Sequence, residues 1–250
     1  MKKILGIITA LTLAMMLTAC GEPADLYAKA VKRYNSAAGA ECSFSDTTTF
    51  TKGADESVTT ASGTVVISLG EARVMSLSGT MAIDPGVGTS IESPFEAYYS
   101  DGRYYASVNG NGVFYAAEWQ EVLRQCGQYF FAEMLTEADF EAIIAEDTED
   151  GGKLITYVVS ADRAAVIPGL TSLWERYADM QVIVGAVQGK LNVDDSGRPV
   201  RQQLSISATV TDADGTNVII SKDCVTEIRL TDDTVSPASP IGGKYREIGN

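Results

Sequence analysis

The chain has 250 residues, of which 19 are basic, 33 are acidic and none is histidine, and its formal net charge at pH 7 is −14. Such an acidic surface repels nucleic acid and anionic lipid headgroups, so no nucleic-acid partner is expected. The lack of histidine excludes Ser-His-Asp and Cys-His catalytic sites, together with zinc sites that use imidazole ligands.

The first twenty residues have the three parts of a secretory signal peptide. Two lysines are followed by an apolar run over residues 4–17 and then by Leu17-Thr18-Ala19-Cys20. The run is shorter than the roughly 20 apolar residues of a membrane-spanning helix. The four-residue motif resembles the lipobox of bacterial lipoproteins, in which the cysteine receives a diacylglycerol group and the signal is cut before it. The resemblance implies cleavage between Ala19 and Cys20 and a lipid on Cys20, whereas the alternative is an ordinary signal with a chance cysteine.

Lipidation would hold the protein on the outside of a membrane, because two acyl chains anchor a protein firmly where one does not. In an organism with a single membrane, this is the outer face of the plasma membrane. Residues 20–24 would form the lipidated cysteine and a short linker of roughly 15 Å, at ~3.5 Å per residue. Because this linker is short, the domain is expected to work close to the lipid surface.

The mature part of the chain is more acidic than the whole. Without Lys2 and Lys3, 17 basic residues remain against 33 acidic ones, which gives a formal net charge of −16.

A helix is expected at the start of the domain, followed by strands. Asp25 as N-cap, with Leu26, Ala30 and Tyr34 at helical spacing, predicts a helix over residues 25–38. From about residue 40 to residue 116 the apolar period is two, which is typical of strands. Asp101-Gly102 and Asn109-Gly110 predict two-residue hairpin turns, since both central positions of a type I′ turn have positive φ. This region is expected to be an antiparallel meander.

Helical spacing returns in the middle of the chain. It predicts a helix over residues 119–134, a short helix from the capping-box pattern at Thr136 to about Ala145, and a third over residues 168–177, with a β-rich run at 154–159. Large apolar faces on helices inside a curved sheet can form a groove for an acyl chain or a peptide. Ordinary core packing is the alternative. The candidate groove residues are Trp119, Leu123, Phe130, Leu170, Trp174 and Tyr177.

The last third has the clearest strand pattern. Residues 200–210 alternate between apolar and polar side chains, which predicts a strand with one face in the core and one in water. Turn sequences at 194–197 and 212–215 bracket this strand, and the alternation continues to Leu230. Three consecutive hairpin strands are expected to close the sheet, with residues 237–250 as a tail.

Three cysteines follow Cys20: Cys42, Cys126 and Cys224. All three lie on the apolar side of an expected helix or strand, which favours buried thiols. An odd number allows at most one internal disulfide, and its pairing stays open. No metal site and no cofactor is expected. The acidic turn at 212–215 lacks the glutamate that a calcium loop needs at its twelfth position, where Asp223 stands instead.

Taken together, the lipobox at 17–20, the hairpin from Tyr98 to Tyr105 and the closing hairpins from Asn192 to Leu230 resemble the Lol-type half-barrel. Periplasmic lipoprotein carriers and mycobacterial glycolipid-carrying lipoproteins share this fold, and similar uncharacterised lipoproteins occur in Gram-positive bacteria. The resemblance implies an α+β fold in which a strongly curved antiparallel sheet wraps around a few helices and the apolar space between them holds acyl chains. The expected division is a signal peptide (1–19), a lipidated linker (20–24), one half-barrel domain (25–236) and the tail.

The expected function is that of a non-enzymatic, monomeric, membrane-anchored protein that binds or carries a lipid or another amphiphile. The acidic charge favours a neutral or cationic ligand. The alternative is a structural or protein-interaction lipoprotein of the cell envelope with a filled core and one exposed apolar patch. A carboxylate enzyme acting on glycans is a third hypothesis, but no motif singles out a pair of catalytic acids.

Overall fold

The computed structural model describes residues 21–131, 135–165, 180–211, 215–239 and 245–248. The helices are α2 (Gly21–Ser36), α3 (Trp119–Cys126) and α4 (Ala161–Ala164), with 3-10 turns η1 (Gly127–Tyr129) and η2 (Glu137–Asp139). The strands are β1 (Gly39–Lys52), β2 (Asp55–Ser68), β3 (Val74–Asp84), β4 (Ile91–Ser100), β5 (Arg103–Val108), β6 (Asn111–Ala116), β7 (Phe140–Asp147), β8 (Lys153–Val159), β9 (Gln181–Val184), β10 (Val187–Val193), β11 (Pro199–Thr211), β12 (Asn217–Thr231) and β13 (Tyr245–Glu247).

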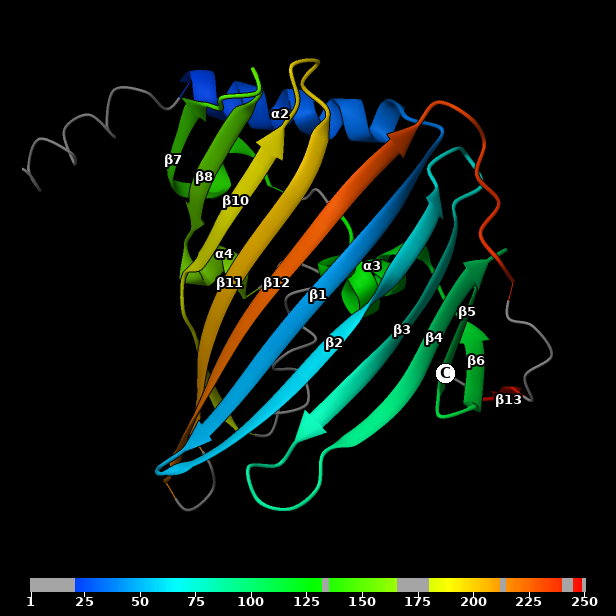
Figure 1. The fold of residues 1–250 in the computed structure, drawn as a ribbon, viewed down its shortest axis with the longest axis vertical. Coiled ribbons are helices and arrows are strands. Elements are labelled where there is room, and N and C mark those ends of the chain that lie inside the picture. Colours follow the sequence, from blue (N-terminus) through cyan, green and yellow to red (C-terminus); the bar gives the residue numbers. More distant parts are fainter. Residues whose placement is uncertain (1–20, 132–134, 166–179, 212–214, 240–244, 249–250) are drawn as a thin grey trace, which may run out of the picture.

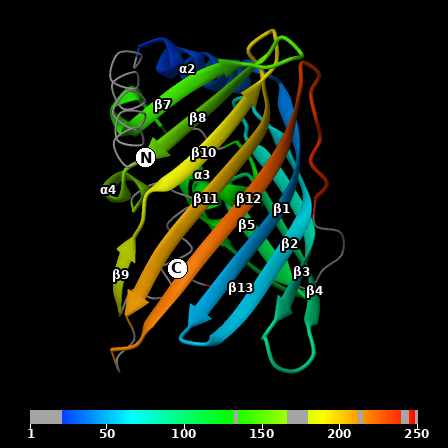
Figure 2. The same ribbon diagram turned by 60° about the vertical axis from the view of Figure 1, so that its left-hand side comes forward.

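These strands form one 13-stranded sheet. Its order is β13-β6-β5-β4-β3-β2-β1-β12-β11-β10-β8-β7, and β9 pairs with β11. Among the described pairs, only β13 and β6 run parallel, and all others are antiparallel. The sheet is strongly curved and does not close, and α3 lies on its concave side (Figures 1 and 2). The expected α+β half-barrel is therefore confirmed.

The helix α2 lies across the end of the sheet where β1 begins and β12 ends (Figure 1). Its buried side chains recur every three or four residues, as an amphipathic helix requires, and they are Ala24, Tyr27, Ala30 and Tyr34. The Tyr27 ring meets Phe140 and Tyr157 edge-on, with centroid distances of 5.1 and 5.5 Å. The helix thus caps one end of the core with aromatic contacts.

The boundaries of α2 differ from the prediction. The helix begins at Gly21, so residues 21–24 form its first turn instead of a linker, and it ends at Ser36. Pro23 fits this place because an amide in the first turn needs no hydrogen-bond partner within the helix. No helix in the described ranges is long and apolar enough to span a membrane.

Two-residue turns join β4 to β5 and β5 to β6, as predicted. The φ angles are 50° at Asp101, 70° at Gly102, 52° at Asn109 and 74° at Gly110. Positive φ at both central positions is the geometry of a type I′ turn, whose twist matches that of the flanking strands. These short-range signals therefore specified the meander correctly.

Within its described residues, the middle of the chain contains less helix than predicted. The helix α3 ends at Cys126 and continues only as η1. The capping box does form, because the Thr136 side chain accepts from the backbone N–H of Asp139 and the backbone N–H of Thr136 donates to Asp139 Oδ2 at 2.7 Å. It closes only η2, and the strand β7 follows where a helix to Ala145 was expected. Pairing of β7 with β8 outweighs the local helix signal. The helix expected over residues 168–177 lies outside the described residues.

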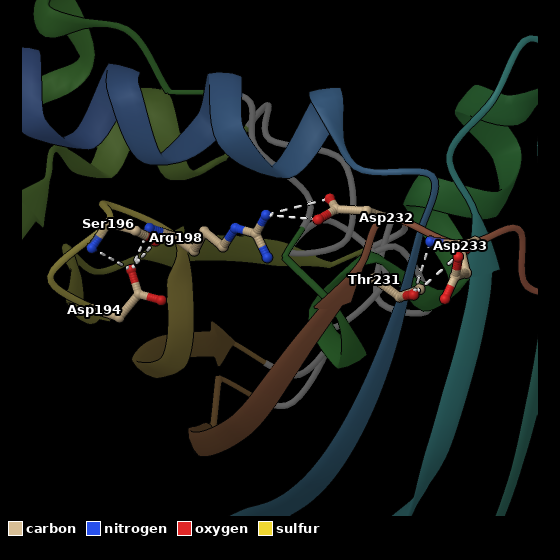
Figure 3. Close-up of polar contacts among 6 residues, drawn as sticks. All are labelled: Asp194, Ser196, Arg198, Thr231, Asp232 and Asp233. Carbon is tan, nitrogen blue, oxygen red and sulfur yellow. Dashed lines mark hydrogen bonds and ion pairs between the residues drawn. The ribbon is translucent and has the colours of Figure 1, made fainter.

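The closing hairpins have the predicted order, with β10, β11 and β12 side by side. Asp194 Oδ1 shapes the first turn by accepting hydrogen bonds from the backbone N–H groups of Ser196 and Arg198, at 3.0 and 2.8 Å (Figure 3). Burial alone would raise the pKa of Asp194, but a hydrogen bond from the Ser196 hydroxyl at 2.7 Å, together with the two backbone hydrogen bonds, lowers it. The Arg198 guanidinium also donates to the Asp232 carboxylate at 2.9 Å, which ties the turn to the end of β12 (Figure 3).

Aromatic rings cover two glycines on the concave face. Gly63 of β2 lies opposite Gly79 of β3, with Phe44 beyond it on β1 and Phe95 on β4. A Cβ at Gly63 would lie 3.0 Å from the Phe44 ring, and one at Gly79 would lie 2.9 Å from the Phe95 ring. Because both glycines lack side chains, the centroids of the Phe44 and Phe95 rings lie only 6.3 Å apart. The Tyr129 ring of η1 stacks on the Phe44 ring with a centroid distance of 4.2 Å.

Candidate functional site

A buried ion pair lies at the centre of the concave face. Lys222 of β12 contacts Asp46 of β1 through Nζ and Oδ2, and the two side chains are only 3% and 4% exposed. Thr48 donates a hydrogen bond to Asp46 Oδ1 at 3.2 Å. The register places Thr48 opposite Lys222, so all three side chains share the concave face. Each charge thus has its partner away from water, which buried charges require.

The η1 turn covers this ion pair. The Tyr129 ring lies 5.8 Å from Lys222 Nζ, within reach of a cation–π contact. Cys224 of β12 donates to the backbone oxygen of Gln128 at 3.1 Å. Burial, followed by the nearby Asp46 carboxylate, raises the pKa of Tyr129. The phenol therefore stays neutral, and the pair Asp46–Lys222 is sealed from solvent.

The sequence held a signal for this ion pair that the pattern analysis missed. Asp46 has the same parity as the inward-facing Cys42 and Phe44, and Lys222 has the parity of Ile220 and Cys224. A charged residue on the apolar parity of each of two strands indicates that the two side chains pair when the strands meet.

The predicted groove residues fall into two groups. Leu123 and Phe130 are buried in the core. Trp119 is half-buried, with its ring 5.6 Å from Tyr99 and 6.2 Å from Phe130, and the Arg73 guanidinium lies 5.1 Å above it. The structure thus places these three side chains in contact with core residues. The other three, Leu170, Trp174 and Tyr177, lie outside the described residues.

Solvent-exposed apolar side chains line the concave face at the end remote from α2. Ile83 pairs with Ile91, and Phe95 pairs with Val108. These side chains have the inward parity, and Leu77 and Ala97 of the same parity nearer α2 are buried. Ile83, Ile91 and Val108 are 36%, 60% and 46% exposed. We call this surface the concave mouth, and it consists of the exposed Ile83, Ile91 and Val108 together with the partly buried Met81 and Phe95.

A hollow of about 820 Å³ lies beside α3 and is lined by side chains that include Tyr115, Glu121, Arg124 and Ile248. Glu121 accepts hydrogen bonds from the Tyr115 hydroxyl at 3.0 Å, Arg124 Nε at 2.8 Å and Gln125 Nε2 at 3.0 Å. Burial opposes ionisation of this carboxyl, but the three hydrogen bonds outweigh burial and lower the pKa of Glu121. Burial and then Glu121 raise the pKa of Tyr115. The hollow therefore combines apolar walls with a fixed carboxylate.

The three described cysteines are buried free thiols, namely Cys42, Cys126 and Cys224. The Tyr104 hydroxyl lies 3.3 Å from Cys126 Sγ. Burial raises the pKa of each of the three thiols to about 12. The disulfide left open by the sequence is absent from this part of the chain.

We expect these thiols to be inert while the protein is folded. The reactive species is the thiolate, and burial both disfavours it and blocks reagent access. At pH 8, 5,5′-dithiobis(2-nitrobenzoate) should label less than about one thiol per chain of the protein from Gly21 onward. The same protein in concentrated urea should show three. Rapid labelling of the folded protein would contradict the packing around Cys42, Cys126 and Cys224.

Two further sequence expectations fall on residues that lie wholly or mostly outside the described ranges. Cys20 and the cleavage motif lie outside the described residues. The acidic turn at 212–215 is described only at Gly215. Across the described ranges, no group of three or more Cys, Asp or Glu side chains is arranged to hold a metal ion.

Comparisons with known proteins identify no relative by sequence: no family model matches, and no curated protein matches. Among solved structures, a domain described as that of an outer membrane lipoprotein-sorting protein from Vibrio parahaemolyticus is 6% identical. It covers 84% of this chain and 93% of its own, with a TM-score of 0.28. A DUF1329 family protein from Desulfovibrio piger is 10% identical, covers 86% of this chain and 96% of its own, and has a TM-score of 0.25.

A β-barrel-like DUF1849 protein from Brucella abortus is 12% identical, covers 79% of this chain and 100% of its own, and has a TM-score of 0.18. The half-barrel fold of this chain is defined by its own strand order.

Proposed function

We propose that this protein is a lipid-anchored, extracytoplasmic and non-enzymatic binding protein, and that its ligand is an amphiphile whose apolar part lies on the concave mouth. The observation that carries the proposal is that the solvent exposure of the inward-facing side chains increases along the concave face, away from α2. Nearer α2 the inward-facing side chains are buried, whereas Ile83, Ile91 and Val108 continue the same rows and are open to solvent. Apolar side chains gathered on a concave surface favour a ligand with apolar parts.

The charges around the concave mouth narrow the class of amphiphile. Four exposed carboxylates, Asp55, Glu56, Asp84 and Glu92, lie at the same end of the sheet as the concave mouth, where the exposed Lys52 lies opposite Asp55. They repel an anionic headgroup, so a neutral or cationic amphiphile is favoured. The apolar part would lie on Ile83 and Ile91, and the headgroup would lie near these carboxylates.

The proposed anchor is a diacylglyceryl group on Cys20. Its support is the lipobox-like Leu17-Thr18-Ala19-Cys20. Cys20 directly precedes α2, which lies at the end of the sheet opposite the concave mouth. The strand β2 has 14 residues and so spans roughly 45 Å, at ~3.3 Å per residue. The ligand would therefore enter the concave mouth from the aqueous side and not from the anchoring membrane, in contrast to the sequence expectation that the domain works close to the lipid surface.

The proposal predicts that a charge in the concave mouth weakens ligand binding. We expect Ile91→Asp to reduce the affinity of the protein from Gly21 onward for N-phenyl-1-naphthylamine, a neutral apolar fluorophore, by at least about tenfold. Such a change corresponds to roughly 1.4 kcal/mol. The matched control is Ile183→Asp on the convex face, where Ile183 is 58% exposed against 60% for Ile91. This control should leave the affinity within about twofold.

Native mass spectrometry of the same protein, with solvent extraction of co-purified molecules, identifies the ligand class. A stoichiometric amphiphile that is lost in Ile91→Asp is the expected result. Equal fluorophore binding by Ile91→Asp and Ile183→Asp would contradict the assignment of the concave mouth. A protein that carries no ligand and takes up no added lipid would instead favour an envelope interaction protein with a filled core.

A further inference from the structure

The edge strand β6 carries a short strand from the far end of the chain. β13 pairs with β6 over three residues, and it is the one parallel strand among the described pairs. The backbone N–H of Ile248 continues the pairing by donating to Phe114 O at 3.1 Å. Arg246 and Glu247 are exposed. A ladder of three residues, two of them with exposed side chains, provides little stability, so an edge covered in this way is open to competition from another strand.

On the convex side of this edge, the space above Gly112 holds an aromatic ring. Tyr245 lies on Gly112, where a Cβ would be 2.5 Å from the Tyr245 ring. The Tyr245 ring meets Tyr105 edge-on at 5.5 Å, and Tyr105 stacks on Phe114 at 5.4 Å. Tyr98 lies 6.0 Å from Tyr105 on the other side. The lack of a side chain at Gly112 therefore creates the space that the ring occupies.

The concave side of the same edge leads into the hollow beside α3. Side chains alternate along a strand, so Tyr245 lies on the convex side and Ile248, past Glu247, lines the hollow with Tyr115 and Glu121. Further along the hollow lies the exposed carboxylate of Glu118. A strand that continued beyond the position of Ile248 would bring its next inward side chain toward Glu118.

We propose that the β6 edge is a strand-addition site for an extended segment of a partner protein, and that residues 245–248 occupy this site when the partner is absent. The partner segment runs parallel to β6 and places an aromatic ring on Gly112 and an apolar side chain at the position of Ile248. Two residues later it carries a basic side chain, which pairs with Glu118. In strand addition the main-chain hydrogen bonds provide affinity and the alternate side chains provide specificity. This proposal is independent of the amphiphile and of the concave mouth.

The test uses the protein from Gly21 onward and a fluorescein-labelled peptide, Ala-Tyr-Arg-Glu-Ile-Gly-Lys, which copies residues 245–249 and ends on lysine. Tyr245→Ala removes the ring that holds β13 in place. Because the intact tail competes for the edge, fluorescence anisotropy should show at least about tenfold tighter peptide binding by Tyr245→Ala than by the unmodified protein. The matched control Arg246→Ala changes an exposed side chain of the same strand and should bind like the unmodified protein.

A second substitution tests the space above Gly112 itself. Gly112→Val in the Tyr245→Ala background fills the space for the ring, and valine is favoured in strands, so the fold should persist while peptide binding is lost. If circular dichroism shows that Tyr245→Ala is unfolded, Ile248→Asp releases the tail instead. The proposal is overturned if the peptide binds no variant, if it binds the unmodified protein and Tyr245→Ala equally, or if Gly112→Val leaves binding intact. A Tyr245→Ala protein that dimerises in analytical ultracentrifugation would replace the partner with a second copy of this chain and so also overturn it.

Discussion

Replacing Lys222 with methionine is expected to lower the free energy of unfolding by about 3–5 kcal/mol, the range for breaking a buried ion pair by removing one partner. The substitution leaves the Asp46 carboxylate at 4% exposure beside the uncharged hydroxyl of Thr48. An unpaired charge in such a place is far more costly than the loss of the pair itself. Urea unfolding monitored by circular dichroism measures the difference.

Two further variants show whether the loss of stability comes from leaving a buried charge unpaired or from the loss of an ion pair as such. Asp46→Leu combined with Lys222→Met removes both charges, and its stability should return to within about 1–2 kcal/mol of the original protein or exceed it. Arg201→Met breaks the ion pair with Glu227, whose side chains lie 3.0 Å apart on β11 and β12 and are half-exposed. An exposed pair contributes roughly 0–1 kcal/mol, so this variant should be nearly neutral. A Lys222→Met protein as stable as Arg201→Met would contradict the buried pair.

Gly63→Ala is expected to destabilise the protein by about 1–3 kcal/mol, the usual cost of overpacking. A Cβ at this position would lie 2.2 Å from the backbone oxygen of Ser78 and 2.7 Å from the Cα of Gly79. Neither backbone atom can move without disturbing the pairing of β2 with β3. The added methyl group would also push against Phe44, whose ring covers Gly63. Thermal and urea unfolding of the variant measure the loss.

The chain offers a matched control at Gly70. A Cβ there would meet nothing within 4 Å, and its φ is not in the left-handed region. Gly70→Ala should therefore leave the stability unchanged or raise it by about 0.4–1 kcal/mol, because alanine restricts the unfolded chain. If Gly63→Ala and Gly70→Ala unfold at the same urea concentration, the close approach of β2 and β3 at Gly63 is incorrect.

Much of the sheet could be predicted because its signals are local. Asp101-Gly102 and Asn109-Gly110 specify their turns through φ alone, and the alternation over residues 200–210 shows which face of β11 is buried. The strand β7 was missed for the opposite reason. The capping box at Thr136 forms as the sequence suggests, but it closes only η2. The residues after it pair with β8, and a capping pattern carries no information about that pairing.

The candidate sites were harder to predict than the fold. The parity of Met81 and Ile83 shows that they face inward, but their exposure depends on how far α3 and η1 extend along the concave face. Trp119, Leu123 and Phe130 were singled out for their size, and large aromatic side chains serve equally well as core. The pairing of Gly112 with Tyr245 connects residues far apart in the sequence, and no local pattern indicates it.

The strand order also bears on how the chain reaches this fold. β1 to β6 are consecutive hairpins, and the remaining antiparallel strands form a second block that joins the first only where β12 pairs with β1. That pairing connects Gly39 with Thr231, so it forms only after nearly the whole chain is available. Pairing over such a separation is slow, because loop closure precedes the contacts that reward it. The first block is therefore synthesised well before β12, and the edge of β1 that pairs with β12 stays unpaired until β12 is available.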